Sequence, residues 1–525
     1  MLWKKKLILL PFILGLFLIF YSWSISYPIS TDSPSDFLYN HISPFYWLGL
    51  VIVYPSLYIM GFLFKWNSLK WIVALGIVTF IHSSVYFYWS IPGSDSHYFR
   101  GLTEYFVETG DLDPSKAYHS YFQWPLFFVL EKVAYTLGVN LRFFEFALFA
   151  ILGFLYTTSL YYLFHRFSKY GAHLAVISYF ILMTYYLNYQ FAPFSLAFAL
   201  LLILFMLDSH EYSSSAMVLT KLIIFTAITL IHSFTPVFFI SYVLLKFFFS
   251  KDRQYVRLFQ ITSMIFLSVL TLRAVFFLPM ALEELLGLQS TVYVRFSETL
   301  FIQATTPIDE LAQNIGRIVL ISTGLVTGSG FIILFLKRKI GKINLALFFS
   351  GIIYVIASTV LPILGTRAFA ILGIPLSLGI IYFLKTRFRI VFQCLFLILI
   401  TLFAFVPLHS SFSSTRSQLM FQTEENYQCA NFWIDYYSPD EPRLMGTDPQ
   451  TAWYLVTKLR SPNVSFEINF FNRNITDYDC ILFTISLESS VLRYNYKMEE
   501  ITRETNKLST VYDSGNALIF SKNDN

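Results

Sequence analysis

Long apolar segments alternate with short polar ones along the first 408 residues of the chain. Most apolar segments approach 20 residues, about the length at which an α-helix crosses a hydrocarbon core of roughly 30 Å. The pattern predicts a polytopic α-helical membrane protein with about thirteen transmembrane helices. The predicted spans are residues 7–23, 43–64, 71–90, 143–164, 172–188, 192–208, 217–232, 234–250, 258–278, 314–336, 344–362, 368–384 and 388–408.

The composition indicates that lipid is the main solvent of this chain. Of its 525 residues, 56% are hydrophobic and only 13% are charged, whereas a soluble domain carries roughly 25% charged residues. The net charge of +5 is small and is not gathered on a basic face. Binding to nucleic acid is therefore excluded as the main function.

Lysine and arginine residues are unevenly distributed between the predicted spans. With a cytoplasmic N-terminus, clusters such as those at residues 251–257 and 337–342 fall in inner loops, and the short outer loops contain few cations. This positive-inside bias predicts a cytoplasmic N-terminus and an extracytoplasmic C-terminus. Residues 91–141 and 279–313 are then outer loops.

The chain divides into two predicted parts. Residues 1–408 form the transmembrane domain, and residues 409–525 form a small extracytoplasmic α/β domain. Within the second part, "NFWIDYY" predicts a helix, "RLMGTD" a strand end, "CILFTIS" a buried strand and "LSTVYDSGNALIFSK" a hairpin. Cys429 and Cys480 both lie there, and their pairing is left open.

The first outer loop gathers acidic residues directly after an apolar segment, in "IPGSDSHYFRGLTEYFVETGDLDP". Ser94 or Asp95 is a suitable helix N-cap, and Gly110 is a natural stop. An apolar stripe between them predicts a short amphipathic helix on the membrane surface; its members are Tyr98, Phe99, Leu102, Tyr105 and Phe106.

The other face of this helix carries Arg100, Glu104 and Glu108 at i, i+4 spacing. That spacing predicts a solvated ladder of charges. A second helix along the interface is predicted from Pro125 to near Gly138. On local pattern alone, Asp95 needs no role beyond helix capping.

This chain resembles the C-type glycosyltransferase (GT-C) superfamily in one arrangement. A carboxylate lies at the outer end of an early span and begins a long loop that contains surface helices. The stretches "PGSDSHYFRGLTEYFVETGDLDP" and "YHSYFQWPLFFVLEKVAYTLGV" are similar to the loop of archaeal membrane glycosyltransferases. The stretch "ITLIHSFTPVFF" and the closing "VYDSGNALIFSK" resemble other parts of the same group of enzymes. The resemblance implies an inverting enzyme that takes a sugar from a polyprenyl-phosphate donor, such as a dolichyl-phosphate sugar, and acts in protein or lipid glycosylation. Its expected location is the cell membrane, with the active site extracytoplasmic.

The resemblance also assigns roles to individual residues. Asp95 matches the loop acid that acts as general base on the acceptor hydroxyl. Arg367 matches an arginine that meets the lipid phosphate, for which its planar charged fork is suited, although an interfacial anchor explains it almost as well. The weaker candidates for substrate binding or as secondary acids are His232, Arg273, His97, Glu108 and Asp111.

The chain departs from the oligosaccharyltransferase branch of this superfamily. That branch has a paired-acid metal motif in its first loop, where this chain reads "SDSH", and "FWIDYYSPD" lacks the paired tryptophans and the glycine of its second motif. We therefore expect no transfer of a whole glycan to asparagine. A divalent metal cofactor is possible but is not supported.

Two other classes of function remain open on the sequence. A lipid-linked oligosaccharide flippase would share the apolar spans, but such transporters usually show internal repeats, and none is found here. A non-catalytic membrane protein would leave the acidic loop as plain surface. The expected partners of the enzyme are a polyprenyl-phosphate-linked sugar donor, a glycan, lipid-linked or protein acceptor, and membrane lipids, with no nucleic acid.

Overall fold

The computed structural model describes most of the apolar part of the chain and a smaller share of the tail. The described residues are 9–25, 43–63, 68–84, 94–112, 121–168, 171–183, 192–209, 214–287, 307–360, 365–384, 386, 389–405, 424–437, 443–446, 454, 464–467, 480–484, 509–513 and 517–521.

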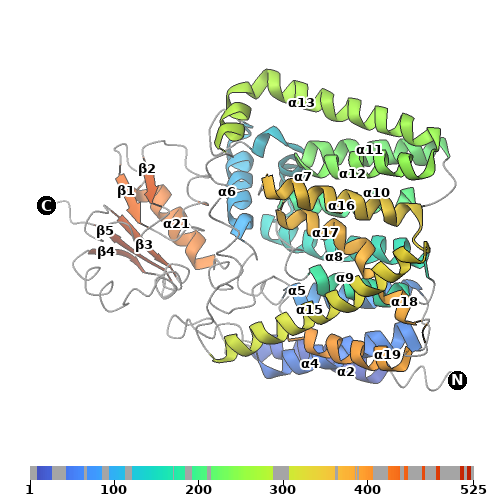
Figure 1. Ribbon diagram of the computed structural model, residues 1–525. Coiled ribbons are helices and arrows are strands. Elements are labelled where there is room, and N and C mark those ends of the chain that lie inside the picture. The colour runs from blue at the N-terminus through green and yellow to red at the C-terminus, as the bar shows by residue number, and fades with distance from the viewer. Residues whose placement is uncertain are drawn as a thin grey trace.

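The described part is mostly helical, and most of its long helices run side by side across the view in Figure 1. In chain order they are α2 (Leu9–Ile25), α4 (Pro44–Tyr58) with the π-helical turn η2 (Ile59–Leu63), α5 (Ser68–Ser84), α6 (Ser94–Thr109), α7 (Leu126–Thr136), α8 (Leu141–His165), α9 (Ala172–Met183), α10 (Pro193–Asp208), α11 (Ser215–Ile231), α12 (Thr235–Ser250), α13 (Arg253–Gly287), α15 (Pro307–Leu336), α16 (Lys342–Val360), α17 (Gly365–Ser377), α18 (Ile380–Leu384), α19 (Arg389–Phe403) and α21 (Glu424–Tyr437).

Four of the described helices are long and apolar enough to cross a membrane. Their apolar segments are Pro44–Gly61, Phe143–His165, Arg253–Arg273 and Asn314–Leu336, and eight shorter apolar helices accompany them. Together these helices place the protein in a membrane. The number of spans and their orientation stay predictions.

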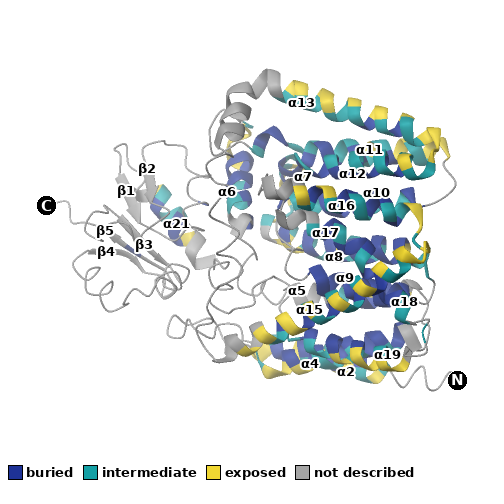
Figure 2. Cartoon of the chain, in the orientation of Figure 1, coloured by how far each residue is buried: buried dark blue, intermediate teal, exposed yellow. Residues whose placement is uncertain are grey.

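Burial differs sharply between the inner and outer helices of this assembly (Figure 2). All twelve residues of α9 are buried by neighbouring helices. On α13 and α15, by contrast, large side chains such as Leu267 and Leu325 are 59% and 68% exposed. Leucines are left exposed on these faces because hydrocarbon, unlike water, is a good solvent for them.

Two predicted segments, the outer loop at 279–313 and the span at 368–384, differ from the structure. The outer loop predicted at residues 279–313 is partly helical, since α13 continues to Gly287 and α15 begins at Pro307. The predicted span at 368–384 is interrupted between α17 and α18, four residues after Pro375. Gly379, at this break, lies so close to α15 that an added Cβ would be 1.8 Å from the Thr327 carbonyl oxygen.

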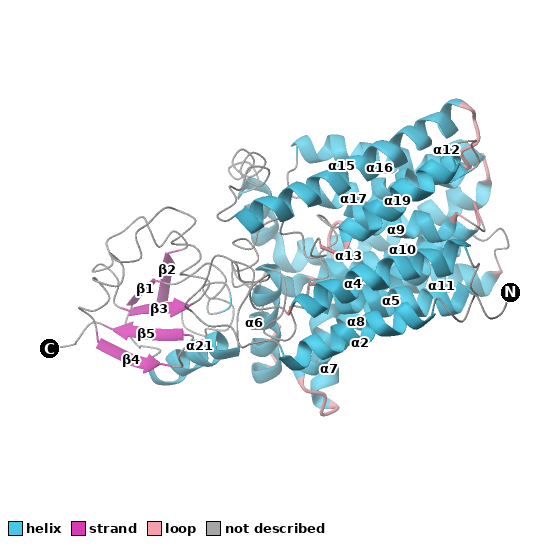
Figure 3. Ribbon diagram, turned by 90° about the horizontal axis from the view of Figure 1, so that it is seen from below, coloured by secondary structure: helices cyan, strands magenta, loops and turns pink. Residues whose placement is uncertain are grey.

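A five-stranded mixed sheet lies in the tail, apart from the helices (Figure 3). Its strands are β1 (Arg443–Gly446), β2 (Val464–Glu467), β3 (Cys480–Thr484), β4 (Ser509–Asp513) and β5 (Ala517–Ser521), in the order β2-β1-β3-β5-β4. Strands β1, β2 and β3 run parallel, and β5 pairs antiparallel with β3 and β4. Helix α21 packs against β5 and β3. That residues 409–525 fold as a separate outer domain stays a prediction.

Candidate functional site

Helix α6 is the short amphipathic helix that the sequence predicts. It begins at Ser94. Ser94 and Asp95, the two predicted caps, are therefore both helical residues of its first turn. Its apolar side chains are buried, among them Phe99 and Leu102. The helix ends where Gly110 adopts φ +72°, a conformation that favours glycine, and donates its N–H to the Phe106 carbonyl at 2.9 Å.

Helix α6 packs on α7 through aromatic rings. Phe99 contacts Phe127 and Phe128, with ring centroids 6.3 Å apart in each pair, and Phe122 stacks edge-on against Phe128 at 5.0 Å. These rings are all buried. As Figure 1 shows, α6 lies across the ends of the long helices, on the side that faces the sheet.

Of the solvated ladder that the spacing predicts on α6, Glu108 is exposed, but Arg100 and Glu104 are not. The side chains of Arg100 and Glu104 are only 11% and 13% exposed, and Arg100 Nε lies 2.9 Å from Glu104 Oε1. The other carboxylate oxygen, Oε2, accepts a hydrogen bond of 2.5 Å from the buried Tyr454 hydroxyl. That hydroxyl also lies 3.0 Å from Asn431 Oδ1 on α21. The expectation fails because the tail of the chain covers this face.

A second carboxyl group, Glu131 of α7, is buried beneath α6. The Thr103 hydroxyl donates a hydrogen bond to Glu131 Oε2, while Oε1 has no hydrogen-bond partner among the described residues. Burial, reinforced by the nearby Glu145 carboxyl, raises the pKa of Glu131 well above its usual value. Glu131 therefore favours the protonated form and can hold α6 on α7 without burying a charge.

The two strongest sequence candidates, Asp95 and Arg367, and the weaker candidate His97 lie in the first turns of helices. Asp95 and His97 belong to α6, and Arg367 is the third residue of α17. Their side chains lie outside what the structure describes, so their roles stay predictions. A carboxylate in the first turn of a helix is stabilised in its ionised form by the helix dipole.

The course of the chain brings the candidates to one end of the helices. Helix α16 is antiparallel to its partner α17 along the bundle, so that α17 begins at the end where α6 lies (Figure 1). Arg273 lies 20 residues along α13 from Arg253, about 30 Å of helix. His232 follows the last residue of α11 at this same end.

Arg273 is positioned by the segment between α6 and α7. Its Nε donates a hydrogen bond to the buried Gln123, and its guanidinium lies 5.0 Å from the ring centroid of Trp124. Arg273 is half-buried, less enclosed than its place in a span predicts. The pair Gln123–Trp124 was not singled out from the sequence, although the aromatic stretch "YFQWP" was read as interfacial.

His232 is buried and has a structural contact. Its Nδ1 accepts from the backbone N–H groups of Phe234 and Thr235 at 3.3 Å each, and lies 3.0 Å from the Thr235 hydroxyl. An accepting Nδ1 puts the ring proton on Nε2. These bonds cap the N-terminus of α12, and a role of His232 in substrate binding stays a prediction.

The two secondary acids lie at the far end of α6 from Asp95. Both Glu108 and Asp111 are exposed, and the Asp111 N–H bonds to the Thr109 hydroxyl at 3.1 Å. In the part of the chain that the structure describes, no three His, Cys, Asp or Glu side chains lie close enough to hold a metal ion. The roles of Asp95 and the arginines in acid–base and phosphate chemistry stay predictions.

No protein-family model and no curated protein sequence matches the chain. Among solved structures, it is similar to the Archaeoglobus fulgidus oligosaccharyltransferase, at 12% identity and a TM-score of 0.46, over 90% of this chain and 73% of that one. It is also similar to ArnT from Cupriavidus metallidurans, at 12% identity and a TM-score of 0.36, over 86% of this chain and 98% of the apo ArnT chain or 97% of the chain bound to undecaprenyl phosphate.

Both neighbours are membrane glycosyltransferases of the GT-C superfamily, which the sequence resembles. The identities are low and the TM-scores lie below 0.5. These values assign no function to this chain.

Proposed function

We propose that this protein is an inverting membrane glycosyltransferase of the GT-C type. It moves a sugar from a polyprenyl-phosphate donor to a glycan, lipid-linked or protein acceptor on the extracytoplasmic face. The observation that supports the proposal is that three candidate residues lie at the same end of the helices. Asp95 lies in the first turn of α6, Arg367 lies in the first turn of α17, and Arg273 bonds to Gln123 at this end.

In the proposed reaction, the acceptor hydroxyl oxygen attacks the anomeric carbon while the bond from that carbon to the phosphate oxygen breaks. Asp95 takes the hydroxyl proton, help that is typically worth about 10²–10⁴-fold. The polyprenyl phosphate leaves with the bonding electrons. Arg367, with Arg273 as a second ligand, stabilises this phosphate through charge-assisted hydrogen bonds.

The substitution Asp95→Asn tests the proposed base. Asparagine fits the first turn of a helix but cannot take a proton at neutral pH. We expect the variant to insert and melt like the parent and to lose at least about 10²-fold in transfer rate. The assay is sugar release or transfer by the purified protein in detergent with a panel of polyprenyl-phosphate sugars, undecaprenyl-phosphate sugars included.

The matched control is Asp435→Asn, an exposed acid of α21, which should keep the parental rate. Parental transfer by Asp95→Asn would show that Asp95 is not the base, and Glu108 and Asp111 would be tested next. Movement of an intact lipid-linked sugar across a bilayer, with no transfer by the parent, would favour the flippase instead.

A further inference from the structure

A cavity of about 840 Å³ opens at the end of the helices opposite to α6. It is lined by residues from the C-terminal ends of α8, α10 and α12, from α11, and from the N-terminal ends of α13 and α16. Helix α8, which connects the α7 end of the molecule to the cavity, is 25 residues or about 37 Å long. The cavity is therefore distinct from the proposed active site.

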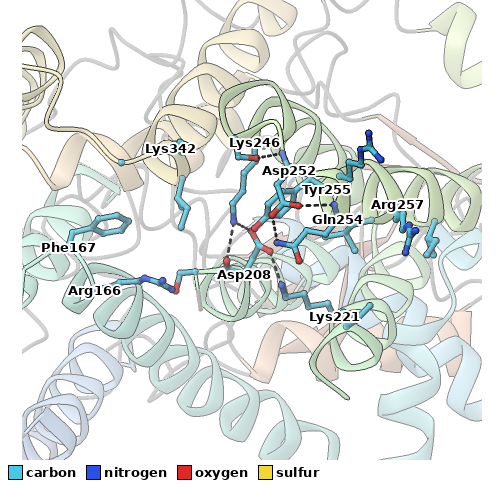
Figure 4. A pocket seen from close by; sticks show the side chains of 18 residues that line it. Arg166, Phe167, Asp208, Lys221, Lys246, Asp252, Gln254, Tyr255, Arg257 and Lys342 are labelled. Atoms are coloured by element: carbon cyan, nitrogen blue, oxygen red, sulfur yellow. Dashed lines mark hydrogen bonds and ion pairs between the residues drawn. The ribbon is translucent and has the colours of Figure 1, made fainter. Parts of the chain in front are cut away.

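The floor of the cavity is a buried cluster around Asp208, shown in Figure 4. Lys221 Nζ lies 2.7 Å from Asp208 Oδ1, and the Tyr242 hydroxyl donates to Oδ2 at 2.7 Å. Lys246 also bonds to Oδ2, and its ammonium lies 4.3 Å from the ring centroid of Tyr255. One carboxylate thus serves two buried ammonium groups, which leaves the floor with an excess positive charge.

The walls and the rim add further cations. Arg166 is half-buried, and Arg253, Arg257 and Lys342 are exposed on the rim. The carboxylate at the rim is Asp252, whose Oδ1 and Oδ2 accept from the backbone and side-chain nitrogens of Gln254 at 3.0 Å and 2.7 Å. Among the described residues, six cationic side chains and two carboxylates line the cavity, so it attracts anions.

The backbone strengthens this preference. Helix α13 begins at Arg253 and α16 begins at Lys342, and both residues line the cavity. The first N–H groups of a helix lack partners within it and carry partial positive charge, so they favour phosphate. At α13, the Asp252 carboxylate already accepts from the Gln254 N–H, so it is the N-terminus of α16 that adds to the cations of the cavity.

An apolar path leads from the cavity along α13. Ile261 lines the cavity and is 40% exposed, and Met264 and Leu267, at the helical spacing of three residues, are 68% and 59% exposed. This face of a candidate membrane span is open to hydrocarbon. A soluble phosphate would use only the cations, whereas a lipid would also lay an acyl chain along these side chains.

We infer that this cavity binds the phosphate headgroup of an anionic glycerophospholipid from the membrane leaflet opposite to α6. The phosphate lies among the rim cations and the N-terminus of α16, and the acyl chains follow α13 past Ile261 and Met264. Cations are expected in inner loops in general. Lys221 and Lys246, however, lie within apolar helices, where burial is costly unless the charges have partners.

The test compares two double variants of the full-length protein that each remove one arginine and one lysine. The first, Arg257→Gln with Lys342→Gln, removes two exposed rim cations. The control, Arg338→Gln with Lys339→Gln, removes two exposed cations outside the cavity. Affinity for dioleoyl phosphatidylglycerol and for dioleoyl phosphatidylcholine is measured by native mass spectrometry in detergent, with thermal unfolding as the check on folding.

We expect the parent to bind phosphatidylglycerol more tightly than phosphatidylcholine. Cations near the membrane surface attract anionic lipids, so the rim variant, which lacks two of them, should bind phosphatidylglycerol about tenfold or more weakly, and the control should bind like the parent. Equal affinity of the parent for both lipids, or equal losses in the two variants, would overturn the inference.

Inorganic phosphate and glycerol 3-phosphate distinguish the source of the phosphate. As competitors against phosphatidylglycerol, they should displace it poorly because they lack the acyl chains. Displacement by either compound at concentrations similar to those of the lipid would overturn the assignment to a lipid and leave a site for soluble phosphate.

Discussion

At the α6 end of the helices, charged side chains contact groups from distant segments, whereas at the opposite end they surround a cavity. Glu104 is shared by Arg100 and Tyr454, and Glu131 is held neutral beneath α6. Asp208, at the other end, serves two lysines and leaves a surplus of positive charge. Buried charge is thus compensated in two ways. At the α6 end the charges are paired or neutralised, which holds the helix in place, whereas at the cavity end the cations are only partly paired, which suits the binding of an anion.

The largest effect is expected at the cavity end, from Asp208→Asn. The substitution keeps the volume but leaves two ammonium groups buried without a counter-charge, at a cost of about 3–5 kcal/mol in the free energy of unfolding. Chemical denaturation in detergent measures this loss. The control Asp252→Asn removes a rim carboxylate and should change stability by less than about 0.5 kcal/mol, since asparagine caps a helix as well as aspartate does. Similar effects in both would show that the cavity does not need Asp208 as a counter-charge.

At the α6 end, Arg367→Lys should impair the enzyme without disturbing the fold. Lysine keeps the charge but loses the planar fork that binds phosphate through two bonds. Loss of one charge-assisted hydrogen bond lowers kcat/KM for the donor by about tenfold or more. Arg317→Lys, an exposed position on α15, is the control and should be silent. If Arg367→Lys and Arg367→Gln are equally active, Arg367 is an interfacial anchor.

A smaller effect is expected from Tyr454→Phe. The change removes the hydroxyl that bonds to Glu104 and approaches Asn431 but leaves the Arg100–Glu104 pair. A buried hydrogen bond to a charged group makes the expected loss about 1–2 kcal/mol in unfolding free energy. Tyr135→Phe on α7, where the side chain is 50% exposed, should cost nothing measurable. Equal stability of the two variants would mean that Tyr454 does not hold α6.

The smallest effect is a change in how stability depends on pH. The folded protein holds the proton of Glu131 above pH 4.5, its ordinary pKa, because burial raises the pKa. Folding then takes up a proton, so the melting temperature should fall as the pH rises from about 4.5 towards the folded-state pKa. Glu131→Gln should remove this slope, and Glu108→Gln, at an exposed position, should keep it. A slope that persists in Glu131→Gln would mean that another group binds the proton.

Local pattern was enough to predict α6, α7 and most elements of the tail. The stripe through Phe99 and Leu102, with a glycine after it, contains all that an amphipathic surface helix needs. The strands at "CILFTIS" and the closing hairpin follow from alternation and turn residues in the same way. Strand β2 was not predicted, since its four residues, "VSFE", carry too little pattern.

The contacts between distant segments could not be predicted. Glu104 was read as solvated because nothing within one helix turn shows that Tyr454 covers it. Lys246 lies 38 residues from Asp208. Both residues lie in apolar helices, and the spacing of residues along the chain does not show how these helices pack on each other. For the candidate site residues, the sequence pattern predicted which of them lie in helices. It could not predict their contacts with distant residues, such as that of Arg273 with Gln123.

The bond between Glu104 and Tyr454 joins residues 350 positions apart, and the ribosome makes them in that order. At about 5–20 residues per second, roughly twenty seconds to just over a minute separate their synthesis. Helix α6 is thus made well before the Tyr454 hydroxyl can bond to it. Translation that stops before residue 454 leaves Glu104 without this bond, so the nascent protein completes this end of the molecule only after most of the apolar helices have been made.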